Sequence, residues 1–399
     1  MAAASSTVLA DRIRGCLVGS LVADAAGMPI HWIYGEAALR SALEGIEATP
    51  EFRPVSANPF YRLPTGRQSG YGDQAIVLLR HCRELALASR QRPGDSAPPL
   101  ARLAYAAAVS AHFGPGTEYD PTATTEYHVD GSPSGRTRRY EADKVSKWPI
   151  DGPWMHHCIK DFNAAVARGE EWPQGSKDDK QADAAAKVAA VVCLHAGHIA
   201  RARAAGSARA ADEALQVAVD EATRTTQDDD LVVSSARLVS RVILECLLGA
   251  PPARAIEVAI AHMRDAARAG RLATDEACAA AAALAVSPTM LARPHQEVVD
   301  ELGNTCKLMN SMQTPLHAAA AASPDKAAMD CFVEAIRATM VARGCNCSRL
   351  CIAGAVLGAS LGTSAVPEDW TARTREAEDI RRSADAIAEF AATQLEERA

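Results

Sequence analysis

The chain has 399 residues, of which 48% are apolar and only 5% aromatic, and its formal net charge is −7. Its lysines and arginines form no basic stripe, so the sequence argues against a nucleic-acid-binding surface. The longest uninterrupted apolar run covers residues 277–286. This is far short of the ~20 residues that cross a bilayer, so no membrane association is expected.

The same composition points to helices. With few rings, the core has to be filled by Ala, Leu and Val, which suit closely packed helices better than sheets. No Pro-, Gly- or Ser-rich linker divides the alanine-rich stretches. We therefore predict an all-α fold with little or no strand. A flexible tail over residues 1–10 would precede a single domain over residues 11–399.

Eleven cysteines are spread along the chain, many of them inside apolar helical stretches. This distribution favours reduced, buried thiols in a cytoplasmic protein, or in an assembly derived from the cytosol, over disulfides. The N-terminus lacks the basic segment and long apolar core of a secretory signal. Arg12 and Arg14 leave a short organelle transit peptide as an alternative.

Two predicted helices, over residues 11–26 and 348–362, carry small residues at every fourth position. These are Gly15, Gly19 and Ala23 in the first helix, and Gly354, Gly358 and Gly362 in the second. Glycine inside a soluble helix is destabilising by about 1 kcal/mol relative to alanine, so repeated glycines on one face imply close approach of another backbone. We expect both helices to be buried, and each is a candidate neighbour of the other. Asp11 is expected to cap the first.

Helical periodicity continues along the chain between irregular segments over residues 51–70 and 114–153. The second segment is long enough to be a functional or disordered insertion. It carries His128 and Trp148, with Trp154 at its end, so part of it should be pinned to the body. Further helices are expected over residues 74–88, 179–195, 231–248, 253–269, 274–285, 325–342 and 370–397.

Two acidic residues and one polar turn stand out from this helical background. Asp24 lies among small residues near the end of the first helix, where a buried carboxylate requires a partner. It either belongs to a functional site or caps a neighbouring helix. Asp73 lies just before the helix over residues 74–88 and, taken alone, would be an ordinary N-cap. The turn over residues 343–349 precedes the second glycine-stepped helix, where backbone N–H groups favour an anion.

In their order along the chain, these motifs resemble those of the ADP-ribosylglycohydrolase family, and within it the branch of the jellyfish lens J-crystallins. The resemblance covers nearly the whole chain. It rests on residues 11–34, 70–74, 178–183, 346–349 and 367–370. It implies an all-α fold with a cleft that holds two Mg²⁺ ions. In the family these metals bind the ribose hydroxyls of ADP-ribose and help water attack its anomeric carbon.

The chain departs from that family at most of the positions that bind the metals. The family's Thr-Asp-Asp-Thr motif falls on Gly-Asp-Gln-Ala, where Asp73 is kept and Gln74 replaces the second aspartate. The family's Gly-Gly-Asp-Thr-Asp-Thr motif falls on Arg-Gly-Cys-Asn-Cys-Ser. Both of its aspartates have become cysteines, Cys345 and Cys347.

We therefore expect the remains of the family's cleft without its metals. Mg²⁺ requires hard oxygen ligands in octahedral geometry, which one carboxylate, an amide and two thiols do not provide. No metal and no other cofactor is predicted. If activity remains, Asp73 is the catalytic candidate. The other residues assigned to this vestigial cleft are the retained Asp24, Tyr71, Gln74, Asp178, Asp179, Gln227 (where the family often has histidine), Cys345, Asn346, Cys347, Ser348 and Arg349.

Two alternatives concern what replaced the metals. One is a zinc site formed by Cys345, Cys347, Cys351 and Asp73, although this spacing is not an established zinc motif. The other is a guanidinium, which is always charged and binds a carboxylate through two hydrogen bonds. On this basis we predict that Arg349, or failing it Arg343, reaches Asp73 or Asp24.

Three functions remain open from the sequence. The first is an ADP-ribosylglycohydrolase-like enzyme with altered metal use. The second is a non-catalytic binder of an ADP-ribose-like small molecule, and the third is a structural, crystallin-like or scaffold component of a larger protein assembly. The lost ligands favour impaired catalysis, and so a pseudoenzyme. His156 and His157 have no partner motif and are interpreted as packed or exposed, and no cysteine lies in a recognisable nucleophile motif.

Overall fold

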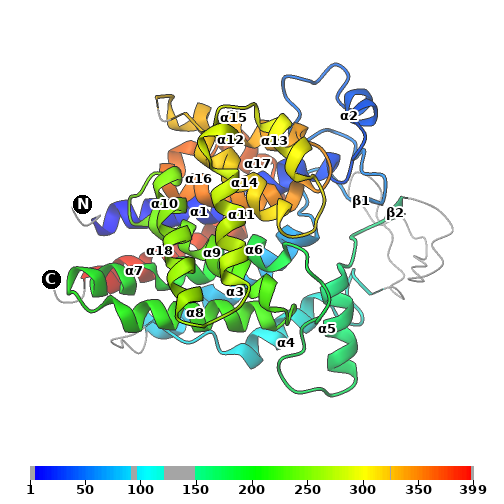
Figure 1. The fold of residues 1–399 in the computed structure, drawn as a ribbon. Helices are drawn as coiled ribbons and strands as arrows, with labels where there is room; N and C mark the ends of the chain where they lie inside the picture. Colours follow the sequence, from blue (N-terminus) through cyan, green and yellow to red (C-terminus); the bar gives the residue numbers. More distant parts are fainter. Residues whose placement is uncertain (1–4, 91–96, 121–148, 324, 397–399) are drawn as a thin grey trace.

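Two helices lie side by side at the centre of the computed structural model of the chain, α1 (Ser6–Gly27) and α16 (Asn346–Leu361) (Figure 1). Their glycines face each other. A Cβ added to Gly358 would lie 2.0 Å from the backbone oxygen of Gly15, and one added to Gly15 would lie 2.5 Å from that of Gly358. No side chain fits at these positions, so the predicted close approach of the two glycine-stepped helices is confirmed.

The structure describes residues 5–90, 97–120, 149–323 and 325–396. These residues are mainly helical and contain one pair of two-residue parallel strands, which confirms the all-α prediction. In chain order, the other elements are η1 (Met28–Ile30), α2 (Glu36–Ala42), β1 (Tyr61–Arg62), α3 (Gly70–Arg90), α4 (Arg102–Phe113), β2 (Ile150–Asp151), α5 (His157–Ala167), α6 (Asp183–Lys187), α7 (Ala189–Ala204), α8 (Ala208–Arg224), α9 (Asp230–Leu247), α10 (Pro252–Arg268), α11 (Asp275–Ala285), α12 (Pro288–Leu291), α13 (His295–Leu302), α14 (Asn310–Ala321), α15 (Ala328–Val341), η2 (Thr363–Ala365), α17 (Glu368–Arg373) and α18 (Ala377–Glu396).

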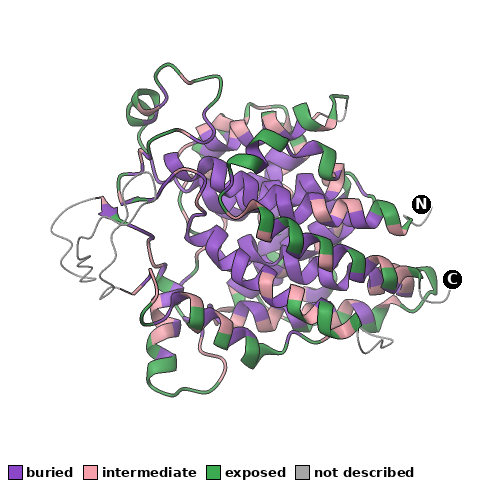
Figure 2. Ribbon diagram, turned by 180° about the vertical axis from the view of Figure 1, so that it is seen from behind, coloured by how far each residue is buried: buried purple, intermediate pink, exposed green. Residues whose placement is uncertain are grey.

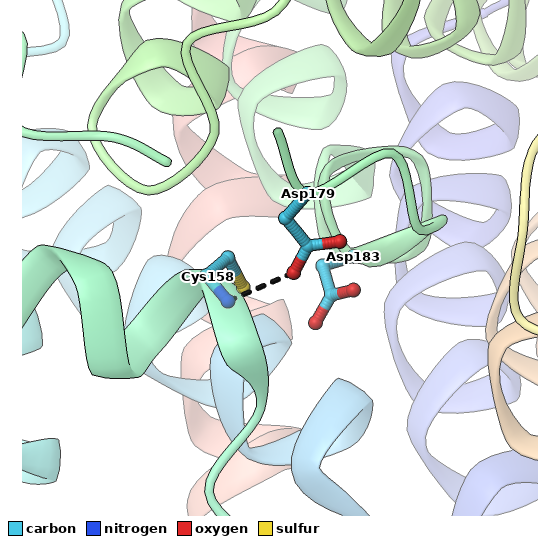
Figure 3. Close-up of side chains that lie close together, drawn as sticks. All are labelled: Cys158, Asp179 and Asp183. Carbon is cyan, nitrogen blue, oxygen red and sulfur yellow. Dashed lines mark hydrogen bonds between the residues drawn. The ribbon is translucent and has the colours of Figure 1, made fainter. Parts of the chain in front are cut away.

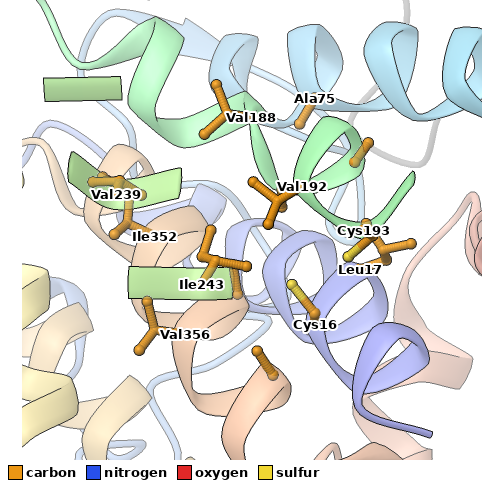
Figure 4. Close-up of a cluster of buried hydrophobic side chains, with 14 of the residues drawn as sticks. Cys16, Leu17, Ala75, Val188, Val192, Cys193, Val239, Ile243, Ile352 and Val356 are labelled. Atoms are coloured by element: carbon orange, nitrogen blue, oxygen red, sulfur yellow. The ribbon is translucent and has the colours of Figure 1, made fainter. Parts of the chain in front are cut away.

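Small aliphatic side chains and thiols fill the core around the central pair. Buried residues gather on the inner faces of the surrounding helices (Figure 2). In Figure 4, Cys16 and Cys193 lie among valine, leucine and isoleucine side chains from several helices. Helices α7 and α18 also meet at backbone level, since a Cβ on Gly197 would lie 1.9 Å from the oxygen of Ala391. All eleven cysteines are free and ten are buried, as the sequence predicted.

The N-terminal helix begins earlier than expected. Ser5 caps α1 by accepting a hydrogen bond from the N–H of Val8 at 3.3 Å, so this segment is not part of a flexible tail. Asp11, the predicted cap, instead accepts hydrogen bonds from the N–H and hydroxyl of Thr363. Serine serves as well as aspartate at an N-cap, and the sequence offers both before the apolar run.

Other differences arise where tertiary contacts override periodicity. The helix predicted over residues 179–195 begins only at Asp183, because Gln227 holds the preceding segment in a non-helical form. Its Nε2 donates to the carbonyl oxygens of Asp179 (3.2 Å) and Gln181 (3.1 Å). The predicted tail helix is split into α17 and α18. Helices α2, α4, α5, α8, α12, α13 and α14 form in segments where no helix was predicted.

The irregular segments meet at one edge of the molecule, where β1 and β2 pair in parallel. Within the insertion predicted over residues 114–153, His128 and Trp148 lie outside the described residues. Trp154 is half-buried and packs edge-on against Trp32, with 5.7 Å between ring centroids. This end of the segment is therefore pinned to the body, as expected.

One stretch, Ser6–Ile30, is long and apolar enough to cross a membrane by length and composition, but 94% of its most apolar window is buried inside the protein. It consists of α1 and η1 at the centre of the fold. Its apolar character is therefore accounted for by the core.

Candidate functional site

Asp24 anchors the turn that starts α3. Its carboxylate is fully buried and accepts hydrogen bonds from the N–H (2.7 Å) and the hydroxyl (2.6 Å) of Ser69. The same hydroxyl accepts a hydrogen bond from the N–H of Tyr71 at 3.1 Å, and so caps the helix. Burial raises the pKa of Asp24. A Cβ on Gly72 would lie 2.3 Å from its Oδ2, so the first two sequence motifs are in direct contact.

Asp73 lies in the first turn of α3 and is not its N-cap, because Ser69 takes that place. Its carboxyl group accepts a short hydrogen bond from the hydroxyl of Tyr119. The guanidinium of Arg67, ion-paired with Glu118, is the cation that acts on it. Burial nevertheless raises the pKa of Asp73 to about 8, so most of this carboxyl group is protonated at neutral pH.

The thiol of Cys345, at the start of α16, is surrounded by side chains that can donate hydrogen bonds. Its Sγ is 3.2 Å from the hydroxyl of Tyr71 and 3.5 Å from Nε2 of His31. The hydroxyl of Ser348 is 3.4 Å away. Burial alone would raise the pKa of the Cys345 thiol, but hydrogen bonds from Cys306, His31 and Ser348 lower it well below its ordinary value.

The rest of the second motif packs onto the end of α1. The Sγ of Cys351 lies 3.6 Å from Oδ1 of Asp24, and the Sγ of Cys347 lies 3.8 Å from its carbonyl oxygen. Nδ2 of Asn346 donates to the carbonyl oxygen of Gly27 at 3.3 Å. Burial raises the pKa of both of these thiols, which therefore behave as small apolar groups.

These thiols belong to a second, smaller core, which we name the thiol–aromatic cluster. Its buried members are Met28, Trp32, Tyr61, Leu63, Tyr71, Ile150, Ala186, Cys345, Cys347 and Cys351, with the partly buried Phe60, Trp154 and Cys306 packed against them. The ring of Trp32 meets that of Tyr61 edge to face at 5.5 Å. Rings and sulfur atoms thus lie together at the start of α16, where the family resemblance implied carboxylates.

A second pair of acids, Asp179 and Asp183, lies beside Cys158 (Figure 3). Oδ1 of Asp183 is 2.5 Å from Nδ1 of His156 and accepts a hydrogen bond from Nε2 of Gln74 at 2.6 Å. Burial alone would raise the pKa of Asp183, but His156 lowers it, and the pKa of His156 is raised in return. The two form a buried ion pair. Asp179 accepts from the N–H of Cys158 at 2.8 Å, and burial raises its pKa to about 6.

The arrangement does not fit the family's metals. Among the described residues, three potential ligands have their ligand atoms within 4.8 Å of one another, and these are Cys158, Asp179 and Asp183. One thiol and two hydrogen-bonded carboxylates fall short of the roughly six oxygen ligands that Mg²⁺ requires. The zinc set predicted from Cys345, Cys347, Cys351 and Asp73 is not brought together, because Asp73 turns to Tyr119.

Two other residues assigned to the cleft lie apart from these thiols. Gln227 is fully buried and structural, since its Oε1 accepts a hydrogen bond from the N–H of Ala184 at 2.9 Å while its amide holds the segment before α6. Asp178 is exposed and takes no part in the site. Asp24, Tyr71, Cys345 and Cys347 do converge where α1, α3 and α16 meet, whereas Asp179 lies beside Cys158 and Asp73 turns to Tyr119.

Neither arginine of the second motif binds a cleft acid. Arg349 is fully buried and donates from Nη2 to the carbonyl oxygen of Arg343. Arg343 is ion-paired with Asp300. The prediction that one of them occupies the vacated cation space is therefore wrong. The cation beside Asp73 is Arg67, which comes from the loop before α3.

Sequence reasoning missed several residues of the site. Arg67, Tyr119 and Cys306 lie in irregular segments, whose contacts no periodicity predicts. His31 follows the first helix inside a segment that carried the resemblance, which is the signal that would have singled it out. His156 is packed while its neighbour is exposed, so both interpretations of the histidine pair hold, one for each residue.

Comparisons with known proteins agree with this fold. The family model described as ADP-ribosylglycohydrolase matches residues 5–397. Crystallin J1A of Tripedalia cystophora is 26% identical over 386 residues, which cover 97% of this chain and 99% of the crystallin. Crystallin J1B of the same organism is 25% identical, with 96% and 98% covered. A solved structure described as an ADP-ribosylglycohydrolase-related protein complex shares the fold, with a TM-score of 0.54, 15% identity, and 96% and 99% of the chains covered.

Proposed function

The chain belongs to the ADP-ribosylglycohydrolase family, and from that premise we propose that it is a family member whose dinuclear Mg²⁺ site has been replaced. Hydrolysis of the glycosidic bond to ADP-ribose is lost with the metals. The observation that carries this proposal is the thiol–aromatic cluster, in which Cys345 and Cys347 take the positions of the family's aspartates.

The surviving carboxylates support the same conclusion, since each already has partners within the chain. Asp24 is bound by Ser69, and Asp183 is paired with His156. Asp73 is hydrogen-bonded, and burial raises its pKa to about 8, so at neutral pH it offers mainly a neutral carboxyl group. Without a metal, nothing in this arrangement lowers the pKa of a water molecule enough to generate hydroxide.

A structural role is the second candidate, and the relatives favour it. The two curated proteins to which the chain is similar along almost their whole length are both named crystallins. A protein of this kind has to stay folded, and the backbone-to-backbone packing of α1 and α16 is consistent with that demand. In this role the partners are proteins of an assembly, whereas a retained cleft without catalysis would bind an ADP-ribose-like small molecule.

The proposal is tested by titration calorimetry with ADP-ribose, with and without Mg²⁺, together with an assay for release of ADP-ribose from an ADP-ribosylated peptide. We expect no release and no effect of Mg²⁺ on any heat of binding. Binding of ADP-ribose without Mg²⁺ would identify the chain as a binder, and absence of binding would favour the structural role.

A restoring variant supplies the control. Replacing Gln74, Cys345 and Cys347 together by aspartate returns three carboxylates to the family positions. This variant is expected to gain Mg²⁺-dependent heat on binding ADP-ribose. Mg²⁺-dependent release of ADP-ribose by the unmodified chain, abolished by Asp73→Asn, would overturn the proposal.

A further inference from the structure

Two cysteines from different loops meet at the edge of the thiol–aromatic cluster. The Cys345 and Cys306 thiols are in hydrogen-bonding contact. Their loops are held together by the hydrogen bond from the N–H of Cys345 to the carbonyl oxygen of Asn304, at 2.8 Å. Gly344 permits this approach, because its φ is +67° and a Cβ there would lie 2.1 Å from the same oxygen.

The two thiols differ in exposure. Cys345 is fully buried, whereas Cys306 is only partly buried. A solute can therefore reach the pair from the side of Cys306 alone. Cysteine oxidation depends on such access and on thiolate character, so a peroxide that reaches the pair enters beside Cys306.

The surroundings of Cys345 favour a negatively charged sulfur. The hydroxyls of Tyr71 and Ser348 and Nε2 of His31 lie 3.2–3.5 Å from its Sγ. Arg349 adds a cation, and its Nε and Nη1 are buried without a hydrogen-bond partner. A buried guanidinium requires a nearby anion.

Within the part of the chain that the structure describes, no carboxylate acts as the counter-charge of Arg349. The groups that act electrostatically on Arg349 are Cys345, Tyr34 and Cys347. The hydroxyl of Tyr34 and the thiol of Cys347 both have raised pKa values because of burial, so they stay neutral. The sulfur of Cys345 is left as the counter-charge of Arg349.

The other close thiol pair lacks these features. Cys16 and Cys193 also contact each other, but both are fully buried among aliphatic side chains (Figure 4). Burial raises the pKa of the Cys193 thiol, and no cation acts on it. This pair serves as an internal comparison, with the same residue type and a similar contact but neither access nor a hydrogen-bond donor other than the partner thiol.

We propose that Cys306 and Cys345 form a redox-active pair that closes to a disulfide when the protein meets a peroxide. The Cys345 thiolate attacks one oxygen of a peroxide that enters past Cys306, the O–O bond breaks and hydroxide leaves, which produces a sulfenic acid on Cys345. The Cys306 thiol attacks that sulfur, the S–O bond breaks, and the departing oxygen takes the proton of Cys306 to leave as water.

The net change consumes one thiolate, one thiol and one hydrogen peroxide, and yields one disulfide, one water and one hydroxide. A dithiol reductant reverses it. The disulfide would join the loop before α14 to the start of α16. The site is independent of the proposed loss of hydrolysis, because it needs neither a metal nor ADP-ribose.

The test uses the full-length protein and a small excess of hydrogen peroxide. Peptide mapping without reduction is expected to find Cys306 cross-linked to Cys345, with loss of two hydrogens in the intact mass, reversed by dithiothreitol. Cys306→Ser and Cys345→Ser should each abolish the cross-link, whereas Cys331→Ser, which removes a thiol elsewhere, should leave it unchanged.

The role of the buried cation gives a second readout. Arg349→Met should slow formation of the disulfide by roughly tenfold, because the rate follows the thiolate fraction, and Arg349→Lys should restore most of it. Three results would overturn the proposal. These are a cross-link at Cys16–Cys193 instead, oxidation of Cys345 to sulfinic acid without a cross-link, or no oxidation of either cysteine.

Discussion

The two halves of the α1–α16 pair are held together by different forces. In one half, Gly15 and Gly358 bring backbone against backbone, and no side chain fits between them. In the other half, Asp24 and Cys345 lie in a network of hydrogen bonds beside aromatic rings. We call the first the packing half, and it fixes the distance between the helices whatever chemistry the protein performs. We call the second the motif half, and it accepts new residues as long as each buried polar group has a hydrogen-bond partner.

If the reaction is lost as we propose, this comparison explains how the fold outlasts it. Removing a metal-binding carboxylate removes the need for the cation, and a thiol of similar size fills the space with little desolvation. A carboxylate that stays behind must be neutralised. Asp24 is bound by Ser69, Asp73 carries a proton at neutral pH, and Asp183 is paired with His156.

The largest effect is expected when one of these new partners is removed. His156→Ala leaves the Asp183 carboxylate buried without its cation, which should lower the free energy of unfolding by about 3–5 kcal/mol. Chemical denaturation measures it. The matched control is His157→Ala at the adjacent, exposed position, expected within about 0.5 kcal/mol of the unmodified chain. Equal effects of the two substitutions would show that the ion pair is not what stabilises this half.

The packing half is tested by a single methyl group. In Gly358→Ala the new Cβ would lie 2.0 Å from a backbone oxygen, so the helices must separate, with an expected loss of about 1–3 kcal/mol. Gly35→Ala is the control, because the nearest atom to its Cβ is 3.8 Å away. Melting temperatures of the two variants compare them directly. An unchanged melting temperature for Gly358→Ala would contradict close packing.

A third effect appears only when the pH is changed. The pKa of Asp73 is about 8 in the folded state against an ordinary 3.8. The folded state therefore holds this proton more tightly, and the stability it contributes is complete below about pH 4 and lost as pH rises through about 8. Relative to Asp73→Asn, the unmodified chain should lose roughly 4–6 kcal/mol across this range, because each pKa unit corresponds to about 1.4 kcal/mol.

Urea unfolding of both proteins at several pH values measures this difference. Asp178→Asn is the control, since Asp178 is exposed and its substitution should not change the pH dependence. If the free energy of unfolding of Asp73→Asn changed with pH in the same way as that of the unmodified chain, the carboxyl group would not be protonated as inferred.

The helices were predictable wherever the apolar period was regular. The predicted bounds of α9, α10 and α11 differ from the observed ones by a single residue at most. The glycine spacing also predicted that each of these helices lies against another backbone, with the other helix as a candidate, because only a neighbouring backbone explains glycine at every fourth position. Short helices such as α13, and α14 with Pro315 inside it, have too few regular turns for such a prediction.

The site was predictable as a set of residues that meet, but not as a set of bonds. The motifs correctly brought Asp24, Tyr71 and Cys345 together. The partners came from loops, as with Tyr119 on Asp73, and sequence patterns carry no information about such long-range contacts. The arginine prediction failed for this reason. Arg349 has the right charge for the vacated space, but it lies in the first turn of a buried helix, where the carbonyl oxygen of Arg343 accepts its hydrogen bond.

The central claim, that the motif half has lost its metals, is tested most directly by the melting temperature with and without millimolar Mg²⁺. A metal bound to the folded state alone stabilises it, by about 2.7 kcal/mol at one hundred times the dissociation constant. We predict no shift for the unmodified chain and none for Asp73→Ala. A rise in melting temperature with Mg²⁺ that Asp73→Ala abolishes would contradict the account.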